Sequence, residues 1–220
     1  TRKRRFIDPT YMRKLFEVYY MEDSAPPPSF EKEVNLAIDE KISDYDVVIV
    51  NDFGHGMITP STISILCKKS KFLAVNAQSN IGFNLVTRYP RADYISIDLP
   101  EARLALANKY GDLEELAVAL IPERVDCKLL AITHGKNGCL TYQPGKAPTK
   151  IPAFTKTVID TMGAGDAFLA VTSPVAAAGA PLDIVGLIGN AAGAIKVGII
   201  GHRKSIDKIA LLKFLTSLLK

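Results

Sequence analysis

The stretch Asp160-Thr-Met-Gly-Ala-Gly-Asp-Ala-Phe168 separates a region of alternating strands and helices from a last third that is predicted to be helical. Gly163 and Gly165 are expected to allow a tight turn, because a residue without a Cβ neither restricts the backbone nor blocks a ligand. A predicted helix over residues 164–178 begins inside the stretch, so its first N–H groups have no partners within the helix. With the helix dipole, such a turn can bind a phosphate group.

Asp166 lies in the first turn of that predicted helix. A carboxylate close to a phosphate needs a task of its own, and the natural one is to accept a proton from an attacking hydroxyl. Phosphoryl transfer requires mainly positioning, charge neutralisation and such a base. The alternative interpretation is a helix N-terminus where the dipole alone favours an acidic residue.

The chain before this stretch alternates between short apolar runs and helical patterns. Such runs are typical of buried parallel strands, and their alternation with helices indicates a layered sheet. We therefore predict an α/β fold with a mostly parallel sheet flanked by helices. The predicted strands cover residues 46–50, 72–75, 94–97, 129–133 and 138–142, and the further predicted helices cover residues 31–42, 60–69, 100–110, 112–120, 182–197 and 207–219.

Two regions are distinguished within this fold. Residues 1–44 are expected to form peripheral strands and a connecting helix, and residues 45–220 the nucleotide-binding and catalytic core. In the last helix, an apolar stripe is expected to face the core rather than a partner. The stripe consists of Ile209, Leu212, Leu215 and Leu219.

The pattern Asp160-Thr161-x-Gly163-Ala164-Gly165-Asp166-x-Phe168 resembles the C-terminal signature of the ribokinase/PfkB carbohydrate kinases. The resemblance implies ATP as substrate and Mg²⁺ as cofactor. It also implies that Gly163, Ala164 and Gly165 form an anion hole and that Asp166 is the catalytic base. Asp160 would help to hold a monovalent cation such as K⁺, which backbone carbonyls of residues 198–205 could complete.

Two further segments resemble the ATP side of that family. The pattern Thr133-x-Gly135-x-x-Gly138 follows a predicted strand and resembles the ATP-contacting loop, although a hairpin turn has the same glycine pattern. Asn190 lies on a predicted helix that resembles the adenine-side helix. An asparagine that packs on a neighbouring element is the alternative.

The segment Asp98-Leu-Pro-Glu101 is expected to begin a helix, with Asp98 as N-cap and Glu101 as the acid of the first turn. The family usually has Asn-x-x-Glu here, which acts on the magnesium–phosphate region. Glu101 matches this pattern and Asp98 departs from it. An additional negative charge near a phosphate is unfavourable unless a metal ion offsets it.

The segment Asn51-Asp-Phe-Gly-His-Gly56 follows a predicted strand, and ligands of open α/β sheets gather at the carboxyl ends of strands. It resembles the Asp-Tyr-Gly-Lys-Gly of heptose-phosphate kinases, which makes Asp52 and His55 candidate substrate contacts. The Asp-Pro-Lys that usually follows the next strand is replaced by Asn76-Ala77-Gln78. The acceptor is therefore left as a sugar or sugar phosphate, with a heptose phosphate as one candidate.

Charge and composition exclude several classes of protein. The chain is 48% hydrophobic with a net charge of +4, and its basic N-terminal run lacks the aromatic stripe of a nucleic-acid site. No apolar run reaches the roughly 18 residues that span a bilayer, and no signal-peptide core is present. The three cysteines form no CxxC pair, so neither a disulfide framework nor a zinc site is expected. We expect a cytoplasmic protein without nucleic-acid or membrane partners.

The resemblance covers nearly all 220 residues, but the N-terminal portion of such kinases is not matched. That portion carries substrate contacts and would also cover part of the central sheet. We therefore expect an exposed sheet edge or apolar surface, which favours self-association or a partner chain. A non-catalytic nucleotide-binding or assembly module is the alternative function. A P-loop kinase is disfavoured because GxxxxGK[ST] does not occur.

Overall fold

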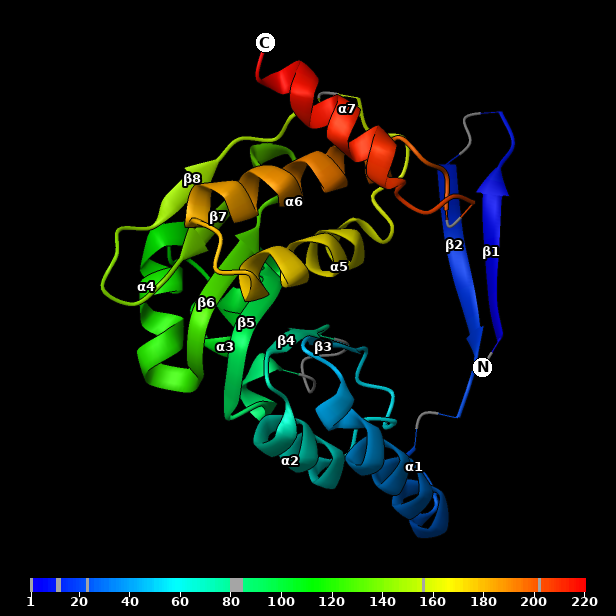
Figure 1. Cartoon of the computed structure of the whole chain (residues 1–220). Coiled ribbons are helices and arrows are strands. Elements are labelled where there is room, and N and C mark those ends of the chain that lie inside the picture. The colour runs from blue at the N-terminus through cyan, green and yellow to red at the C-terminus, as the bar shows by residue number, and fades with distance from the viewer. Residues whose placement is uncertain (1, 11–12, 23, 80–84, 156, 202) are drawn as a thin grey trace.

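The computed structural model describes residues 2–10, 13–22, 24–79, 85–155, 157–201 and 203–220 (Figure 1). Its main sheet has six strands in the order of the chain, from β3 to β8. The first four are parallel and the last two are antiparallel, which confirms the mostly parallel sheet. The strands are β3 (Val48–Asp52), β4 (Leu73–Ala77), β5 (Arg91–Asp98), β6 (Asp126–Thr133), β7 (Cys139–Tyr142) and β8 (Thr149–Ile151).

Most helices begin where the sequence provides a cap. Asp98 and Asp112 form capping boxes with the glutamates three residues later, and Thr59 and Asp207 accept N–H groups of their own helices. The helices are α1 (Pro28–Lys41), α2 (Pro60–Lys69), α3 (Leu99–Ala105), α4 (Leu113–Arg124), α5 (Ala164–Ala177), α6 (Leu182–Val197) and α7 (Lys208–Leu218).

Two predicted elements differ from the structure. The helix predicted over residues 100–110 ends early, because the chain after α3 turns through a left-handed Ala107 with φ of 52°. The stripe of the last helix does not lie in the core, because Ile209 and Leu212 of α7 are exposed. Strand β8 was not predicted, since three residues are too few to show a periodic pattern.

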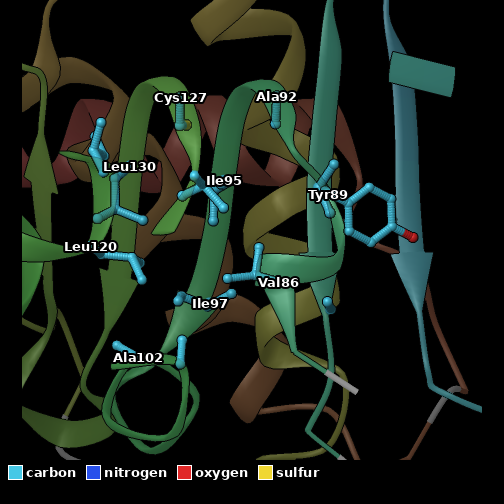
Figure 2. Packing of buried hydrophobic residues seen from close by; sticks show 14 of the residues in the cluster. Val86, Tyr89, Ala92, Ile95, Ile97, Ala102, Leu120, Cys127 and Leu130 are labelled. Carbon is cyan, nitrogen blue, oxygen red and sulfur yellow. The ribbon is translucent and has the colours of Figure 1, made fainter. Parts of the chain in front are cut away.

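Successive strand residues point to opposite faces of the sheet and so divide the core in two. Leu73, Val75, Ile95 and Ile97 belong to the larger cluster, which α2, α3 and α4 cover. Figure 2 shows the residues of β5 in this cluster together with Leu130, Leu120 and Ala102 of neighbouring elements.

The opposite face holds α5 and α6 against the sheet. Tyr94 of β5 is fully buried, and its Oη lies 2.8 Å from Oγ1 of Thr172 in α5. Phe168 of α5 packs against α6 at Gly189, where a Cβ would collide with the phenyl ring. The small residue of α6 and the hydrogen bond to the sheet therefore fix the position of α5, whose N-terminus contains Asp166.

The N-terminal strands β1 (Arg2–Asp8) and β2 (Arg13–Tyr20) form a separate two-stranded sheet beside the main body (Figure 1). Glu17 organises this hairpin. Hydrogen bonds from Tyr19, and then from Lys14 and Arg5, hold the pKa of the Glu17 carboxyl at about 2, against the opposing effect of burial. The rings of Phe6 and Phe16 stack at a centroid distance of 4.4 Å and remain partly exposed.

Strand β3 is an edge of the main sheet. In the part of the chain that the structure describes, it pairs only with β4, and Ile49 on it is 41% exposed. This is the open strand edge that the sequence led us to expect. Among the described residues, no helix has the length and apolar character needed to cross a membrane.

Replacing Gly189 by alanine should destabilise the protein. The new methyl group would overlap the buried ring of Phe168, and overpacking of this kind costs about 1–3 kcal/mol. Gly193→Ala is the matched control on the same helix, because there a Cβ meets no described atom within 4 Å. The control should be neutral or gain up to about 1 kcal/mol through helix propensity. Urea titrations of both variants decide the matter, and equal stabilities would contradict this account of the packing.

Candidate active site

A cavity of about 810 Å³ lies between the carboxyl ends of β5 and β6 and the helices α5 and α6. Its volume is in the range of small-molecule sites. It brings together all the predicted site residues except two. Those that line it are Asp98, Glu101, Thr133, Gly135, Gly138, Asp160, Gly163, Ala164, Gly165, Asp166 and Asn190.

The N-terminus of α5 opens into this cavity. Gly163 is its N-cap and has the left-handed φ of 73°, and no described side chain caps the helix there. The N–H of Ala164 donates to the carbonyl of Thr161 at 3.2 Å. The N–H groups that follow it in the first turn have no acceptor within the helix, because the carbonyls one turn earlier lie before the helix begins. The turn can therefore offer N–H donors and the positive end of a helix dipole to an anion.

Only one of the two glycines makes the tight turn. Gly163 alone adopts the left-handed conformation, whereas Gly165 is an ordinary helical residue. A Cβ on Gly165 would meet no described atom within 4 Å, although the residue lines the cavity. The expectation that Gly165 helps to make the tight turn is wrong. The other part of the expectation, that its missing Cβ leaves room at the cavity, agrees with the structure.

Two acidic residues begin α3 at the same cavity. Oδ1 of Asp98 accepts the N–H of Glu101 at 2.8 Å, and Oε2 of Glu101 accepts the N–H of Asp98 at 2.8 Å. Oε1 of Glu101 also accepts the N–H of Ser79 at 3.2 Å. Burial raises the pKa of the Glu101 carboxyl to about 7, with the charges of Asp98 and Asp166 acting in the same direction. The predicted capping role is thus observed, and it holds a carboxyl group at the cavity.

The loop between β6 and β7 is both a hairpin connection and a wall of the cavity. Gly135 and Gly138 have φ of 53° and 91°, which favours glycine at both positions. A Cβ on Gly138 would collide with the backbone of β8 and the residue after it, whereas one on Gly135 would meet nothing described within 4 Å. The two interpretations of this glycine pattern are therefore compatible with each other.

Asn190 reaches the cavity from α6 but has partners in the protein. Its Nδ2 donates to the carbonyl oxygens of Ile151 at 2.9 Å and Pro152 at 2.8 Å. These contacts fasten the end of β8 to α6. A contact between Asn190 and a nucleotide stays a prediction.

Asp160 is tied to the backbone on both carboxylate oxygens. Oδ1 accepts the N–H of Met162 at 3.0 Å, and Oδ2 accepts the N–H of Gly201 at 2.8 Å. Burial alone would raise the pKa of Asp160, but these hydrogen bonds and the charge of Lys196 outweigh it and lower the pKa. Among the described residues, no group of three or more His, Cys, Asp or Glu side chains could hold a metal ion by itself.

Asp52 and His55 are not among the described residues that line the cavity. Asp52 is only 2% exposed, and its Oδ2 pairs with Nη1 of Arg88 at 3.2 Å and accepts the hydroxyl of Tyr89 at 2.9 Å. Its Oδ1 accepts the N–H of Gly54 at 3.0 Å. In this structure Asp52 thus anchors the loop after β3, and the substrate roles stay predictions.

The cavity also has polar lining residues that sequence reasoning did not select. Lys136 lies between the two glycines of the β6–β7 loop, so its position in that pattern was a usable signal. Lys14 comes from the separate hairpin, and no sequence pattern connects it with the turn at α5. Asn76 and Gln78, which replace the expected charged pair, line the cavity as well, and Nδ2 of Asn76 donates to the carbonyl of Ser96 at 2.7 Å.

Raising the pH should weaken the contribution of Glu101 to stability. The pKa of its carboxyl is about 7 in the folded chain and 4.5 for an unperturbed group. Between these values the folded state holds a proton that the unfolded state has released, so the free energy of unfolding falls as the pH rises through this window. The loss of unfolding free energy over this window is on the order of 3 kcal/mol.

Glu101→Gln removes this titration. The free energy of unfolding of the wild type minus that of the variant, from urea titrations, should therefore decrease between about pH 5 and about pH 8. Glu115→Gln is the control, since it changes the corresponding residue in the exposed capping box of α4. If the difference in unfolding free energy between the wild type and Glu101→Gln does not change with pH, the raised pKa of Glu101 is contradicted.

Known proteins are similar to this chain in sequence and in fold. The chain is 28% identical over 173 residues to the bifunctional protein HldE of Pelobacter propionicus, covering 78% of this chain and 36% of that protein. It is 26% identical over 176 residues to an uncharacterized sugar kinase of Buchnera aphidicola, covering 77% of this chain and 55% of that protein. The chain thus spans well under two thirds of the length of these relatives.

Two solved structures illustrate the fold. Phosphofructokinase-2 from Escherichia coli in complex with potassium superposes with a TM-score of 0.78 at 14% identity, covering 96% of this chain and 68% of that one. Ribokinase from Thermotoga maritima superposes with a TM-score of 0.69 at 18% identity, covering 97% and 69%. The sequence model for the pfkB family carbohydrate kinases matches residues 59–209. Since this match spans most of the chain and includes the turn at α5, the chain belongs to the PfkB family of carbohydrate kinases.

Proposed function

We propose that this protein transfers the γ-phosphoryl group of ATP to a hydroxyl of a sugar or sugar phosphate. One observation carries the proposal: the open N-terminus of α5 and the carboxylate of Asp166 line the same cavity as the glycine loop after β6. An anion site, a base and room for a nucleotide are the parts that phosphoryl transfer needs.

Asp166 acts as the general base in this proposal. Its carboxylate takes the proton as the O–H bond of the acceptor breaks, the acceptor oxygen bonds to the γ-phosphorus, and the bond from that phosphorus to the leaving oxygen of ADP breaks. The N–H groups at the start of α5, around Gly163 to Gly165, stabilise the charge that develops on the transferred group. A preorganised donor of this kind is worth about 10²–10³-fold in rate.

Cationic side chains support a phosphorylated ligand in the cavity. Lys136 lies on the loop that would face the nucleotide, and Lys14 approaches from the hairpin. The Nζ of Lys14 also pairs with Oε1 of Glu17 at 3.1 Å, and this ion pair within the hairpin orients the lysine side chain. Together with the dipole of α5, these charges offset the negative charge of a triphosphate.

The residues present fit a magnesium ion that is bound mainly through phosphate oxygens. Glu101 is 8% exposed, and its pKa is raised mostly by burial and further by the charges of Asp98 and Asp166. A divalent cation near Glu101 and Asp98 would relieve that repulsion, and Mg²⁺ usually takes few protein carboxylates beside substrate phosphates and water. When bound, the ion neutralises charge on the phosphates.

A heptose phosphate is the acceptor that we favour. The segment 51–56 resembles that of heptose-phosphate kinases, and the chain is similar to HldE proteins. Asn76 and Gln78 are a departure from this resemblance, because they place uncharged polar groups at the end of β4 where the resemblance implies a charged pair. Coupled turnover with a panel of sugars and sugar phosphates tests this choice.

The alternative is a non-catalytic nucleotide-binding or assembly module. The open edge of β3 and the exposed rings of the hairpin favour it, because such surfaces attract a second chain. Calorimetric binding of ATP without turnover of any sugar in the panel would support this alternative over the kinase.

In the complete enzyme, Asp166→Asn should abolish most of the phosphoryl transfer and leave the fold unchanged. The amide cannot accept the proton, and general-base catalysis is worth roughly 10²–10⁴-fold. The control is Asp183→Asn, which removes a carboxylate from the first turn of α6 on an exposed surface. A loss in kcat of less than tenfold for Asp166→Asn would show that another group is the base.

Gly165→Val should lower the affinity for ATP without unfolding the protein. A Cβ at this position would meet no described atom within 4 Å, and the two methyl groups that it carries in valine should occupy the place where an anion approaches the N–H groups. Ala170→Val, on an exposed position of the same helix, is the matched control. Calorimetry should show binding by the control and little or none by Gly165→Val. Equal affinities would remove the anion site from the turn.

A further inference from the structure

Lys196 places a positive charge inside the protein at the end of α6. The residue is 5% exposed, and its Nζ donates a hydrogen bond to the carbonyl oxygen of Gly201. A buried ammonium group is costly unless the protein supplies acceptors and negative charge. The position of Lys196 therefore indicates a local environment built for a cation.

Asp160 supplies the negative charge of that environment. Its Oδ2 accepts the N–H of Gly201, so Asp160 and Lys196 hold this glycine through its N–H and its carbonyl respectively. Gly201 has a left-handed φ of 56°, a conformation that favours glycine. The charge of Lys196 is also one of the influences that lower the pKa of Asp160.

Several oxygens around Asp160 that could contact a potassium ion already accept N–H groups of the protein. Both carboxylate oxygens of Asp160 accept backbone N–H groups, and the carbonyl of Val197 accepts those of Ile159 and Asp160 at 2.9 and 3.1 Å. The carbonyl of Gly201 accepts the ammonium of Lys196. A potassium ion placed among these groups would lie close to another positive charge, and that repulsion is strong away from water. The monovalent cation implied by the resemblance does not fit these residues.

We propose that the ammonium group of Lys196 takes the place of a monovalent cation beside Asp160, so that this protein holds its phosphate-binding turn without potassium. A lysine ammonium is a compact charge with three donors, and it can therefore satisfy carbonyl and carboxylate oxygens as a small cation does. Asp160 stands three residues before Gly163, so a fixed charge here supports the segment that leads into α5. The inference rests on the proposed function, because that turn is the anion site of the kinase.

The test measures cation binding and stability without requiring phosphoryl transfer. Equilibrium dialysis with radiolabelled rubidium, a surrogate for potassium, is combined with thermal unfolding in potassium chloride and in N-methylglucamine chloride at equal ionic strength. The wild type should bind no rubidium above background and should have the same Tm in both salts.

Lys196→Ala should behave differently. It should bind rubidium saturably, and its Tm should rise with potassium concentration as expected for a ligand of the folded state. Its affinity for ATP in potassium-free buffer should be about tenfold weaker, a usual size for coupling between two sites, and potassium should restore it. Lys204→Ala, which removes an exposed charge from the same segment, should match the wild type.

Two results would overturn the proposal. One is saturable binding of rubidium by the wild type, a measurement that needs no variant. The other is a Lys196→Ala variant that folds, binds no rubidium and has the same Tm in potassium chloride and in N-methylglucamine chloride. Neither result depends on turnover, so each can be told apart from a failure of the Asp166→Asn experiment.

Discussion

Gly163 turns the chain with a left-handed backbone at the point where α5 begins, and the cavity takes its chemistry from that turn. A side chain with a Cβ would be strained at φ of 73°, and a polar cap would use the same N–H groups that a phosphate needs. The helices α2, α3, α4 and α7 are closed by their own caps, whereas α5 is left open at the cavity. The uncapped N-terminus of α5 can bind an anion at a defined place only if the helix itself is held rigidly.

The core on one side of the sheet supplies that rigidity. Tyr94 joins β5 to α5 through Thr172, and the close approach of Gly189 to Phe168 lets α6 pack tightly against α5. Asn190 in turn ties α6 to the end of β8. These contacts are far apart in sequence, yet all of them position the same helix N-terminus.

Charge is balanced across the cavity in a way that suits a polyphosphate. Asp98, Glu101 and Asp166 supply acidic groups to its lining, while Lys14, Lys136 and the dipole of α5 provide the opposite sign. Behind the turn, Asp160 and Lys196 form a second arrangement in which the protein supplies both the anion and the cation. The first arrangement is open to a ligand and the second is filled by protein groups.

The sequence alone established the α/β class, most strands and helices, and the residues of the turn at α5. These features can be predicted locally, because caps, apolar runs and glycine patterns depend only on residues that are close together in the sequence. Most of the site residues that it indicated do line the cavity, since they belong to short motifs. It failed where the local pattern was short or ambiguous, as for β8, the end of α3 and the exposed stripe of α7.

Only the tertiary structure decided which groups act on one another. Asp52 remains a candidate substrate contact, and only the folded chain shows that Arg88 and Tyr89, both distant in sequence, pair with its carboxylate. Lys14 lines the cavity although it belongs to a separate hairpin. Lys196 donates a hydrogen bond to the carbonyl of Gly201, whose N–H is bound by Asp160. A sequence shows which side chains can be charged or can donate. Whether a charge faces water, a ligand or another side chain depends on contacts between distant segments, and these form only when the chain is folded.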